Sequence, residues 1–135
     1  MAFKLANLES LAPADLAALE RSGVATMDDL LRHVEGRDAR GDLAAHSGVS
    51  ETTLLRLIRM ADLMRIAGIN EAHTQLLDAL GVGSVCELRQ QDATALIKAM
   101  RRKNVELTLV RSVPPESTVA RWIGDAKALP PVFEP

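Results

Sequence analysis

Clustered basic side chains are the feature of this sequence with the clearest capacity for chemistry. Lys98, Arg101, Arg102 and Lys103 fall within six residues, and Glu106 is the one acidic residue among the eight that follow. Lysine and arginine bind phosphate oxygens through charge and hydrogen bonds, so this cluster predicts contact with a phosphate-bearing partner. The whole chain has a formal net charge of −2, and the cluster is therefore a local basic patch on an acidic protein.

Two further arginines, Arg56 and Arg59, lie in a stretch with apolar residues at helical spacing. Leu54, Leu57 and Ile58 belong to that apolar stripe, which predicts an amphipathic helix with one buried face. At about 100° per residue, the two arginines fall on the opposite face, toward solvent or a partner.

Residue types that perform catalysis or bind metal ions are scattered in this sequence. His33, His46 and His73 lack the spacing of metal ligands, so no metal site is expected unless folding assembles one. No Ser/His/Asp order, glycine-rich nucleotide loop or pair of carboxylates stands out, which predicts a non-enzymatic protein without a cofactor. Cys86 is the single cysteine, so no intramolecular disulfide is possible, and its side chain is expected in the core.

Helix signals dominate the elements that must position these residues. Aromatic residues make up only 2% of the chain, which argues against a sheet protein and against single-strand binding by base stacking. Residues that begin or end helices recur: Pro13, Thr26, Ser50, Ser84 and Asp92 at starts, and Gly23, Gly48 and Gly81 at ends. Residues 104–113 fit either a helix or a strand, because Val105, Leu107 and Leu109 alternate with other residues.

An internal repeat organises the chain. One set of residues recurs 65 positions later: Glu51, Thr53, Arg56, Ile58 and Ala61 as Glu116, Thr118, Arg121, Ile123 and Ala126. An earlier set recurs at an offset of 58: Leu19, Gly23, Val24 and Leu30 as Leu77, Gly81, Val82 and Leu88. Two matches in the same order predict that one structural unit is used twice.

The repeated unit resembles the helix-hairpin-helix superfamily through the strings "SGVATMDDL" and "SGVSE", each between two predicted helices. The first unit is most similar to the small helical N-terminal domain of RecA-type recombinases from archaea and eukaryotes. The whole chain resembles a bacterial tandem helix-hairpin-helix family of unknown function. This implies an all-α fold of two tandem units, roughly 5–65 and 66–129, each of about four short helices. The units are expected to pack into one compact body, followed by an irregular tail, 130–135.

In that superfamily, turns between helices hold a DNA phosphate with backbone N–H groups and the next helix N-terminus. The resemblance implies such contacts at Gly48 with Ser50 and at Gly68 with Asn70, where glycine lets the backbone approach an oxygen. The first turn of the chain has Ser10 in the glycine position, and the turn before the last helix has prolines, which lack the N–H donor. The simpler interpretation of both glycines is that they end helices.

These residues lead to one hypothesis for the function and one alternative. The hypothesis is a non-enzymatic module that binds duplex DNA through backbone phosphates, without reading sequence. Its expected contact residues are Gly48, Ser50, Arg56, Arg59, Gly68, Asn70, Lys98, Arg101, Arg102 and Lys103. The alternative is a protein–protein interaction or scaffolding module that binds no nucleic acid. The acidic net charge favours this alternative, as does the proline-containing tail, in which Phe133 docks either on its own domain or on a partner.

No membrane or targeting segment is predicted. The first residues lack a continuous apolar stretch before Glu9, and no segment reaches the roughly 18 apolar residues of a membrane helix. We therefore expect a soluble cytoplasmic protein with no membrane partner, and the sequence leaves its oligomeric state open.

Overall fold

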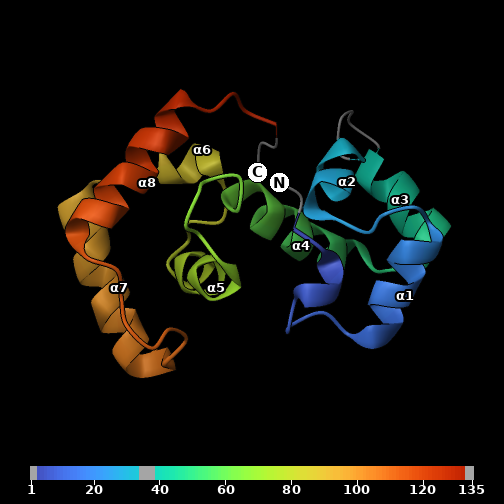
Figure 1. Ribbon diagram of the computed structural model, residues 1–135, viewed down its shortest axis with the longest axis horizontal. Coiled ribbons are helices and arrows are strands. Elements are labelled where there is room, and N and C mark those ends of the chain that lie inside the picture. The colour runs from blue at the N-terminus through green and yellow to red at the C-terminus, as the bar shows by residue number, and fades with distance from the viewer. Residues whose placement is uncertain (1–2, 34–38, 133–135) are drawn as a thin grey trace. The chain divides into compact units, whose positions relative to one another are not determined.

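The regular structure of the chain is helical (Figure 1), as the sequence predicts. The computed structural model describes residues 3–33 and 39–132. Its elements are η1 (Leu5–Asn7), α1 (Pro13–Arg21), α2 (Met27–Arg32), α3 (Ala39–Ser47), α4 (Glu51–Leu63), α5 (Glu71–Ala79), α6 (Val85–Leu88), α7 (Ala93–Leu107) and α8 (Glu116–Ala128). The chain divides into two compact units, unit 1 (Met1–Ala61) and unit 2 (Asp62–Pro135).

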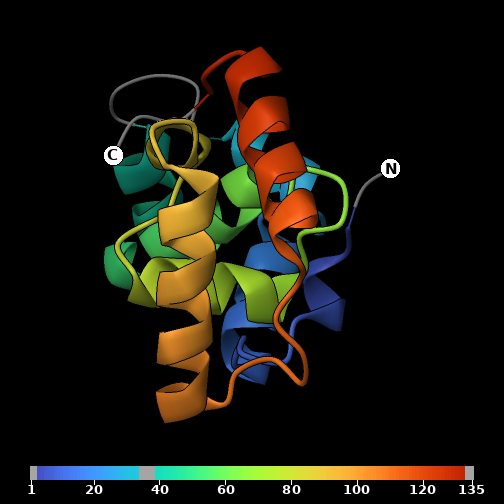
Figure 2. The same ribbon diagram turned by 90° about the vertical axis from the view of Figure 1, so that its left-hand side faces the viewer.

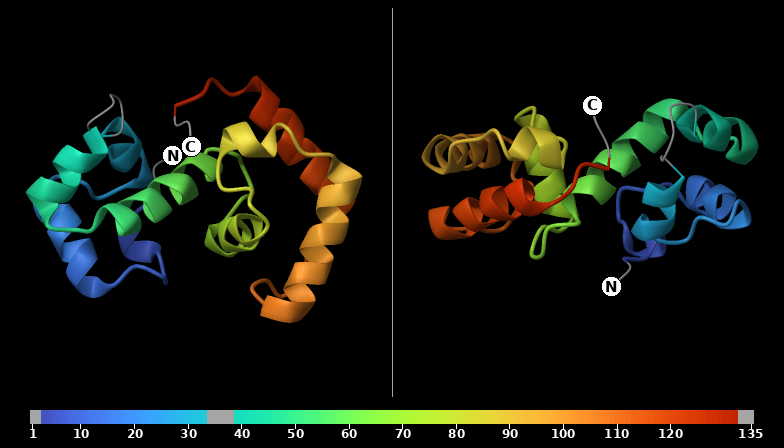
Figure 3. Two further views of the ribbon diagram at one scale, coloured as in Figure 1. Left: turned by 180° about the vertical axis from the view of Figure 1, so that it is seen from behind. Right: turned by 90° about the horizontal axis from the view of Figure 1, so that it is seen from above.

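Unit 1 is built around the end of α1 and the start of α2. Gly23, with φ +84°, ends α1: its N–H donates to the Glu20 carbonyl at 3.1 Å, and the Val24 N–H donates to the Leu19 carbonyl at 2.9 Å. Only a residue that tolerates positive φ fits such a helix end, which explains the glycine. Leu19 and Val24 are fully buried, and α1 contacts α3 (Figure 3).

Thr26 begins α2 with a closed capping box. Its hydroxyl accepts the Asp29 N–H at 3.0 Å, and the Asp29 carboxylate accepts the N–H groups of Ala25 and Thr26, each at 3.1 Å. These bonds satisfy donors that a helix start otherwise leaves open. The Ala25 N–H, and then the bonds of Thr26, hold the pKa of Asp29 below its ordinary value.

Most of these hydrogen bonds have counterparts in unit 2, 58 positions later. The Gly81 N–H donates to the Asp78 carbonyl at 3.0 Å, and the Val82 N–H to the Leu77 carbonyl at 2.9 Å. Ser84 accepts the Glu87 N–H at 3.1 Å, as Thr26 accepts the Asp29 N–H in unit 1. The Glu87 carboxylate accepts the Gly83 N–H at 3.1 Å.

The core of unit 2 is aliphatic apart from one tryptophan. Helix α7 packs against α5 and α8, and α8 also packs against α6 (Figure 2). Trp122 on α8 follows the buried Leu57 by the 65 positions of the internal repeat and is 1% exposed. Cys86 is half-buried, and the expectation that it belongs to the core is wrong, because α6 is a single turn that buries Val85 and Leu88 instead.

Two arginines hold the start of the C-terminal tail against unit 2. Arg89 Nη2 donates to the Leu129 carbonyl at 2.9 Å, and Arg65 Nη2 donates to the Pro130 carbonyl at 2.6 Å. The described part of the tail, 130–132, is irregular, and the expected docking of Phe133 lies outside the described residues.

Candidate nucleic-acid interface

Helix α7 presents three cationic side chains, Lys98, Arg101 and Arg102, to solvent. Their spacing of three and four residues places them on one face of the helix. Within residues 3–33 and 39–132, no carboxylate forms an ion pair with any of the three. Lys103 is different, because its Nζ lies 3.5 Å from Glu106 Oε2. The predicted basic cluster therefore consists of three unpaired cations, which we call the α7 face, and one paired lysine.

The α7 face lies within the helix, since α7 continues past the cluster to Leu107. Asn104 fixes this end: its side chain accepts the N–H groups of Leu109 and Val110 at 2.9 and 3.0 Å and donates to the Val110 carbonyl at 2.9 Å. Thr108 has φ +50°, an uncommon value for a β-branched residue. The apolar residues whose alternation suggested a strand thus lie at the end of a helix, and the Asn104 side chain fixes that end.

At the Gly48 turn, the polar groups are bonded within unit 1. Gly48 has φ +81°, and its N–H donates to the Ala44 carbonyl at 2.9 Å. The Ser50 hydroxyl accepts the Thr53 N–H at 3.2 Å and donates to the Thr53 hydroxyl at 3.0 Å. Gly48 and Ser50 therefore end α3 and begin α4, as the simpler interpretation predicts.

Arg56 and Arg59 are half-buried on α4, although the sequence places them toward solvent. Arg56 Nη1 donates to the Ser10 hydroxyl at 3.1 Å, and its Nη2 donates to the Ser10 carbonyl at 3.4 Å. Ser10 precedes Arg56 by 46 positions, so the helical periodicity of α4 alone does not reveal this contact.

Asn70 and His73 close the start of α5 in unit 2. Asn70 Oδ1 accepts the His73 N–H at 2.9 Å, and His73 Nδ1 accepts the Asn70 N–H at 3.2 Å. This is a capping box in which histidine takes the place usually held by glutamate or glutamine. The groups of Asn70 expected to contact a phosphate are thus bonded to His73 as long as Nδ1 of its ring carries no proton.

Gly68 precedes this cap with φ +93°, and two side chains of α8 lie against it. A Cβ at Gly68 would stand 3.0 Å from Arg121 Nη2 and 3.5 Å from Trp122 Nε1. Arg121 Nη2 donates to the Ala67 carbonyl at 3.0 Å. Arg121 was not among the predicted contact residues at this turn. The match of Arg121 to Arg56 in the internal repeat could have indicated it, because each arginine donates to the first turn of its own unit: Arg56 to Ser10 and Arg121 to Ala67.

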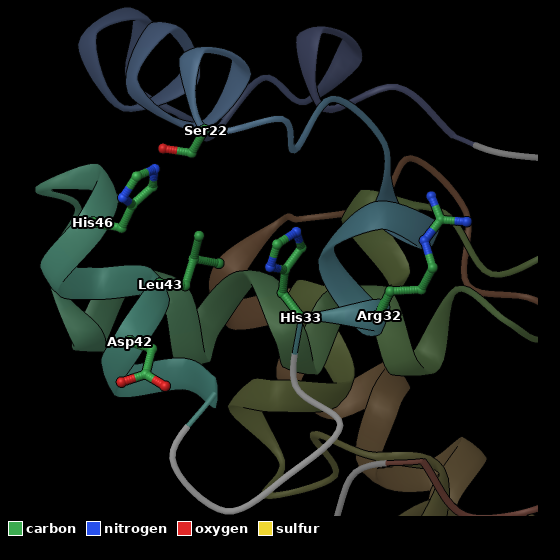
Figure 4. Close-up of a pocket in the computed structure, with 6 residues that line it drawn as sticks. All are labelled: Ser22, Arg32, His33, Asp42, Leu43 and His46. Atoms are coloured by element: carbon green, nitrogen blue, oxygen red, sulfur yellow. The ribbon is translucent and has the colours of Figure 1, made fainter.

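One pocket in unit 1, of about 340 Å³, is lined by Ser22, Arg32, His33, Asp42, Leu43 and His46 (Figure 4). The Ser22 hydroxyl points toward the His46 ring, whereas Arg32 and Asp42 extend away from this pair. The hydroxyl donates to the Ala18 carbonyl at 3.1 Å, so His46 does not activate it as a nucleophile.

Among the described residues, no group of three or more His, Cys, Asp or Glu side chains could hold a metal ion. The same part of the chain contains no helix that could cross a membrane.

The comparisons with known proteins identify the family. A family model described as a domain of unknown function (DUF4332) matches residues 9–129. The chain belongs to this family. Neither the curated proteins nor the solved structures contain a match to the chain.

The predicted contact residues of this DUF4332 domain divide between its two units. Four lie in unit 1, at the Gly48 turn and on α4: Gly48, Ser50, Arg56 and Arg59. Six lie in unit 2, at the Gly68 turn and on α7: Gly68, Asn70, Lys98, Arg101, Arg102 and Lys103. Of these ten, Lys98, Arg101 and Arg102 combine exposure, one shared helix face and the absence of a carboxylate partner within the described ranges.

The environment of His73 predicts a pH-dependent stability for the DUF4332 domain. Burial lowers the pKa of His73 from its ordinary value of 6.5, and a hydrogen bond with the Gly68 backbone opposes part of this shift. The unfolded chain therefore binds the proton more readily than the folded chain does. The contribution of His73 to stability is complete above about pH 6.5 and is lost as the pH falls through the lowered pKa.

We expect His73→Gln to remove this part of the pH dependence, because glutamine keeps a capping oxygen but does not titrate. The measurement is the urea midpoint, followed by Trp122 fluorescence, between about pH 7.5 and about pH 5. The wild-type midpoint should fall more steeply than that of the variant, while carboxylates affect both proteins equally. Parallel pH curves would contradict the expectation.

Proposed function

We propose that this protein is a non-enzymatic module that binds duplex DNA through backbone phosphates, with the α7 face of unit 2 as its main contact. The observation that carries the proposal is the presence of three exposed cations on one helix face, without a carboxylate partner in the described ranges. A duplex presents one negative charge about every 1.7 Å along its axis, so a row of cations on a rigid helix fits it well. Such contacts position a protein without reading bases.

The tandem helix-hairpin-helix interpretation supports the proposal. The bonds at Gly23 and Val24 recur at Gly81 and Val82 in the same positions relative to their helices. These repeated helix ends support the interpretation that one structural unit is used twice. Resemblance of fold alone leaves function open, so the charges of α7 carry the proposal of DNA binding.

The Gly48 turn contributes less to the proposed interface. The Ser50 hydroxyl and the Arg56 guanidinium are bonded to Thr53 and Ser10, so a phosphate would have to displace bonds that already exist. The cations of the α7 face exchange water for phosphate oxygens without breaking a bond inside the protein. We therefore place the stronger contact on α7.

Replacement of both arginines of the α7 face, as Arg101→Glu/Arg102→Glu, is expected to abolish most duplex binding. Each phosphate that the protein neutralises adds about 0.9 to the slope of log affinity against log salt, so the slope should become shallower by about that amount for each phosphate the variant no longer binds. The measurement is fluorescence anisotropy with a labelled duplex, between about 50 and about 200 mM salt.

The matched control is Lys4→Glu/Arg21→Glu, which makes the same change in net charge at exposed positions of unit 1. It should reduce affinity only through the general change in charge. If both double variants bind equally, the α7 face is not the interface. If the wild-type protein does not bind at low salt, the DNA proposal fails.

An exposed apolar group favours protein–protein interaction as the second candidate. Val105 is 85% exposed and Leu107 is 42% exposed, both in the last turns of α7, whose end Asn104 holds in place. Rigid exposed aliphatic side chains beside cations suit the surface of an acidic partner protein. Absence of duplex binding by the wild-type protein at low salt, together with loss of a co-purifying protein in Val105→Asp, would favour this candidate.

A further inference from the structure

A buried donor without an acceptor lies at the Gly68 turn. Trp122 is 1% exposed, and within the described ranges its indole N–H has no hydrogen-bond partner. Leaving such a group unsatisfied costs about 1–3 kcal/mol. Its Nε1 and the Arg121 Nη2 flank the same point, the position a Cβ at Gly68 would occupy, at 3.5 and 3.0 Å. Because Gly68 has no side chain, both donors lie close to the backbone of the turn.

His73 is the group at this turn that can change its hydrogen-bonding role. Its ring packs against Trp122 with 5.0 Å between ring centroids, and its Nδ1 accepts the Asn70 N–H at 3.2 Å. Only an unprotonated Nδ1 can accept this bond. Protonation would set two donors against each other at this distance and break the capping bond. An oxygen about 2.8 Å from each nitrogen would satisfy both donors at once.

Charged residues lie on α5 and on the helices around the His73 turn, α8 and α7. On α8, the Arg121 guanidinium lies over Gly68 and pairs with Asp125, its Nη1 lying 3.1 Å from the Asp125 carboxylate. On α5 itself, Glu71 immediately follows the capping residue. Helix α7, which also packs against α5, directs Lys98 and its neighbouring arginines to solvent. Arg121 is therefore the cation at this turn, and to share an anion with a protonated His73 it would exchange part of its bonding to the Ala67 carbonyl and to Asp125.

We propose that the Gly68–His73 turn is a binding seat for a phosphate-type oxyanion, formed when His73 is protonated. The Asn70 N–H and the His73 Nδ1–H donate to one oxygen, and Arg121 donates to the anion from α8. The N-terminus of α5 adds a favourable dipole. Gly68 and Asn70 are exposed, so an anion can reach the turn from solvent. The assignment of a DNA phosphate to this seat rests on the proposed function. Binding of a small oxyanion at the seat does not depend on it and is measured separately.

Proton and anion binding at this seat must be coupled in both directions. An anion that binds only the protonated form raises the affinity of His73 for its proton, and a rise in pH releases the anion. Sulfate is a suitable probe, because it is a tetrahedral oxyanion whose charge stays constant between about pH 5 and about pH 8. Sodium chloride at equal ionic strength controls for screening by salt.

The test is an NMR titration of the three histidine rings of the full chain, in sulfate and in chloride. Sulfate should move the midpoint of His73 upward and leave the midpoints of His33 and His46, which lie in unit 1, at their chloride values. A His73 midpoint that is equal in the two salts would overturn the proposal, as would an equal displacement of all three rings.

The variant His73→Gln tests the proton coupling in a chain that keeps its capping oxygen. At about pH 5, sulfate should perturb the amides of residues 68–72 in the wild-type protein and not in the variant. Perturbation of equal size in both proteins would show that His73 protonation is not required. Duplex binding at about pH 8 reports the α7 face with His73 neutral. If sulfate has no effect on His73 of the wild-type protein while duplex binding is intact, the seat alone is refuted. If sulfate has its effect while the duplex does not bind, the proposed function fails and the seat is assigned to a small phosphate compound.

Discussion

Replacement of Asp62 by alanine is expected to lower the unfolding free energy of unit 2 by about 3–5 kcal/mol. The Asp62 side chain is 1% exposed and its carboxylate makes two bonds. Oδ1 accepts Arg65 Nη1 at 2.9 Å, and Oδ2 accepts the Val85 N–H at 2.8 Å. The second bond ties the end of α4 to the start of α6 across 23 positions of sequence.

The large expected cost comes from what the substitution leaves behind. The Arg65 side chain is only 15% exposed, so without Asp62 a nearly buried cation keeps the neutral Pro130 carbonyl as an acceptor but loses its carboxylate. The buried Val85 N–H loses its acceptor as well. A buried ion pair gives little net stability compared with an apolar pair, but removal of one partner leaves the other charge uncompensated.

Trp122 makes this prediction straightforward to measure, because it is the single tryptophan of the chain and lies in the core of unit 2. Urea unfolding followed by its fluorescence reports this unit directly. The matched control is Asp125→Ala, which removes an exposed pair whose side chains are 49% and 46% exposed. That variant should lose under about 1 kcal/mol. Equal losses in the two variants would show that burial of Asp62 has no particular energetic effect.

The sequence predicts the local features of this fold well, because their partners lie within five positions of each other. Thr26 with Asp29, and Asp92 with the Ala95 N–H, are caps whose residues and spacing are visible in the chain. Gly23 and Gly81 occupy helix ends with positive φ, which few other residues adopt readily.

Contacts between distant positions could not be predicted in the same way. The bonds from Asp62 to Val85 and from Arg121 to Ala67 depend on how helices pack, which no local pattern specifies. Arg56 illustrates the consequence: helical periodicity directs it outward, yet Ser10 takes both of its terminal nitrogens. His73 was missed for another reason, since histidine is outside the usual capping-box pattern.

Replacement of Trp122 by alanine is expected to destabilise unit 2 by about 3–5 kcal/mol, because a large buried aromatic side chain leaves a cavity that its neighbours fill only in part. Trp122 has the largest side chain among the fully buried residues of the described structure. It packs with Val119, Ile123 and the other members of the unit 2 core. The measurement is urea unfolding followed by far-UV circular dichroism, since the fluorescent group is lost.

The variant Trp122→Phe separates the volume of the side chain from its polar atom. Phenylalanine fills much of the same space and lacks the indole N–H, which has no acceptor within the described ranges. Removal of an unsatisfied donor offsets part of the lost packing, so this variant should lose clearly less stability than Trp122→Ala. Similar losses in both variants would mean that the indole N–H makes a stabilising bond.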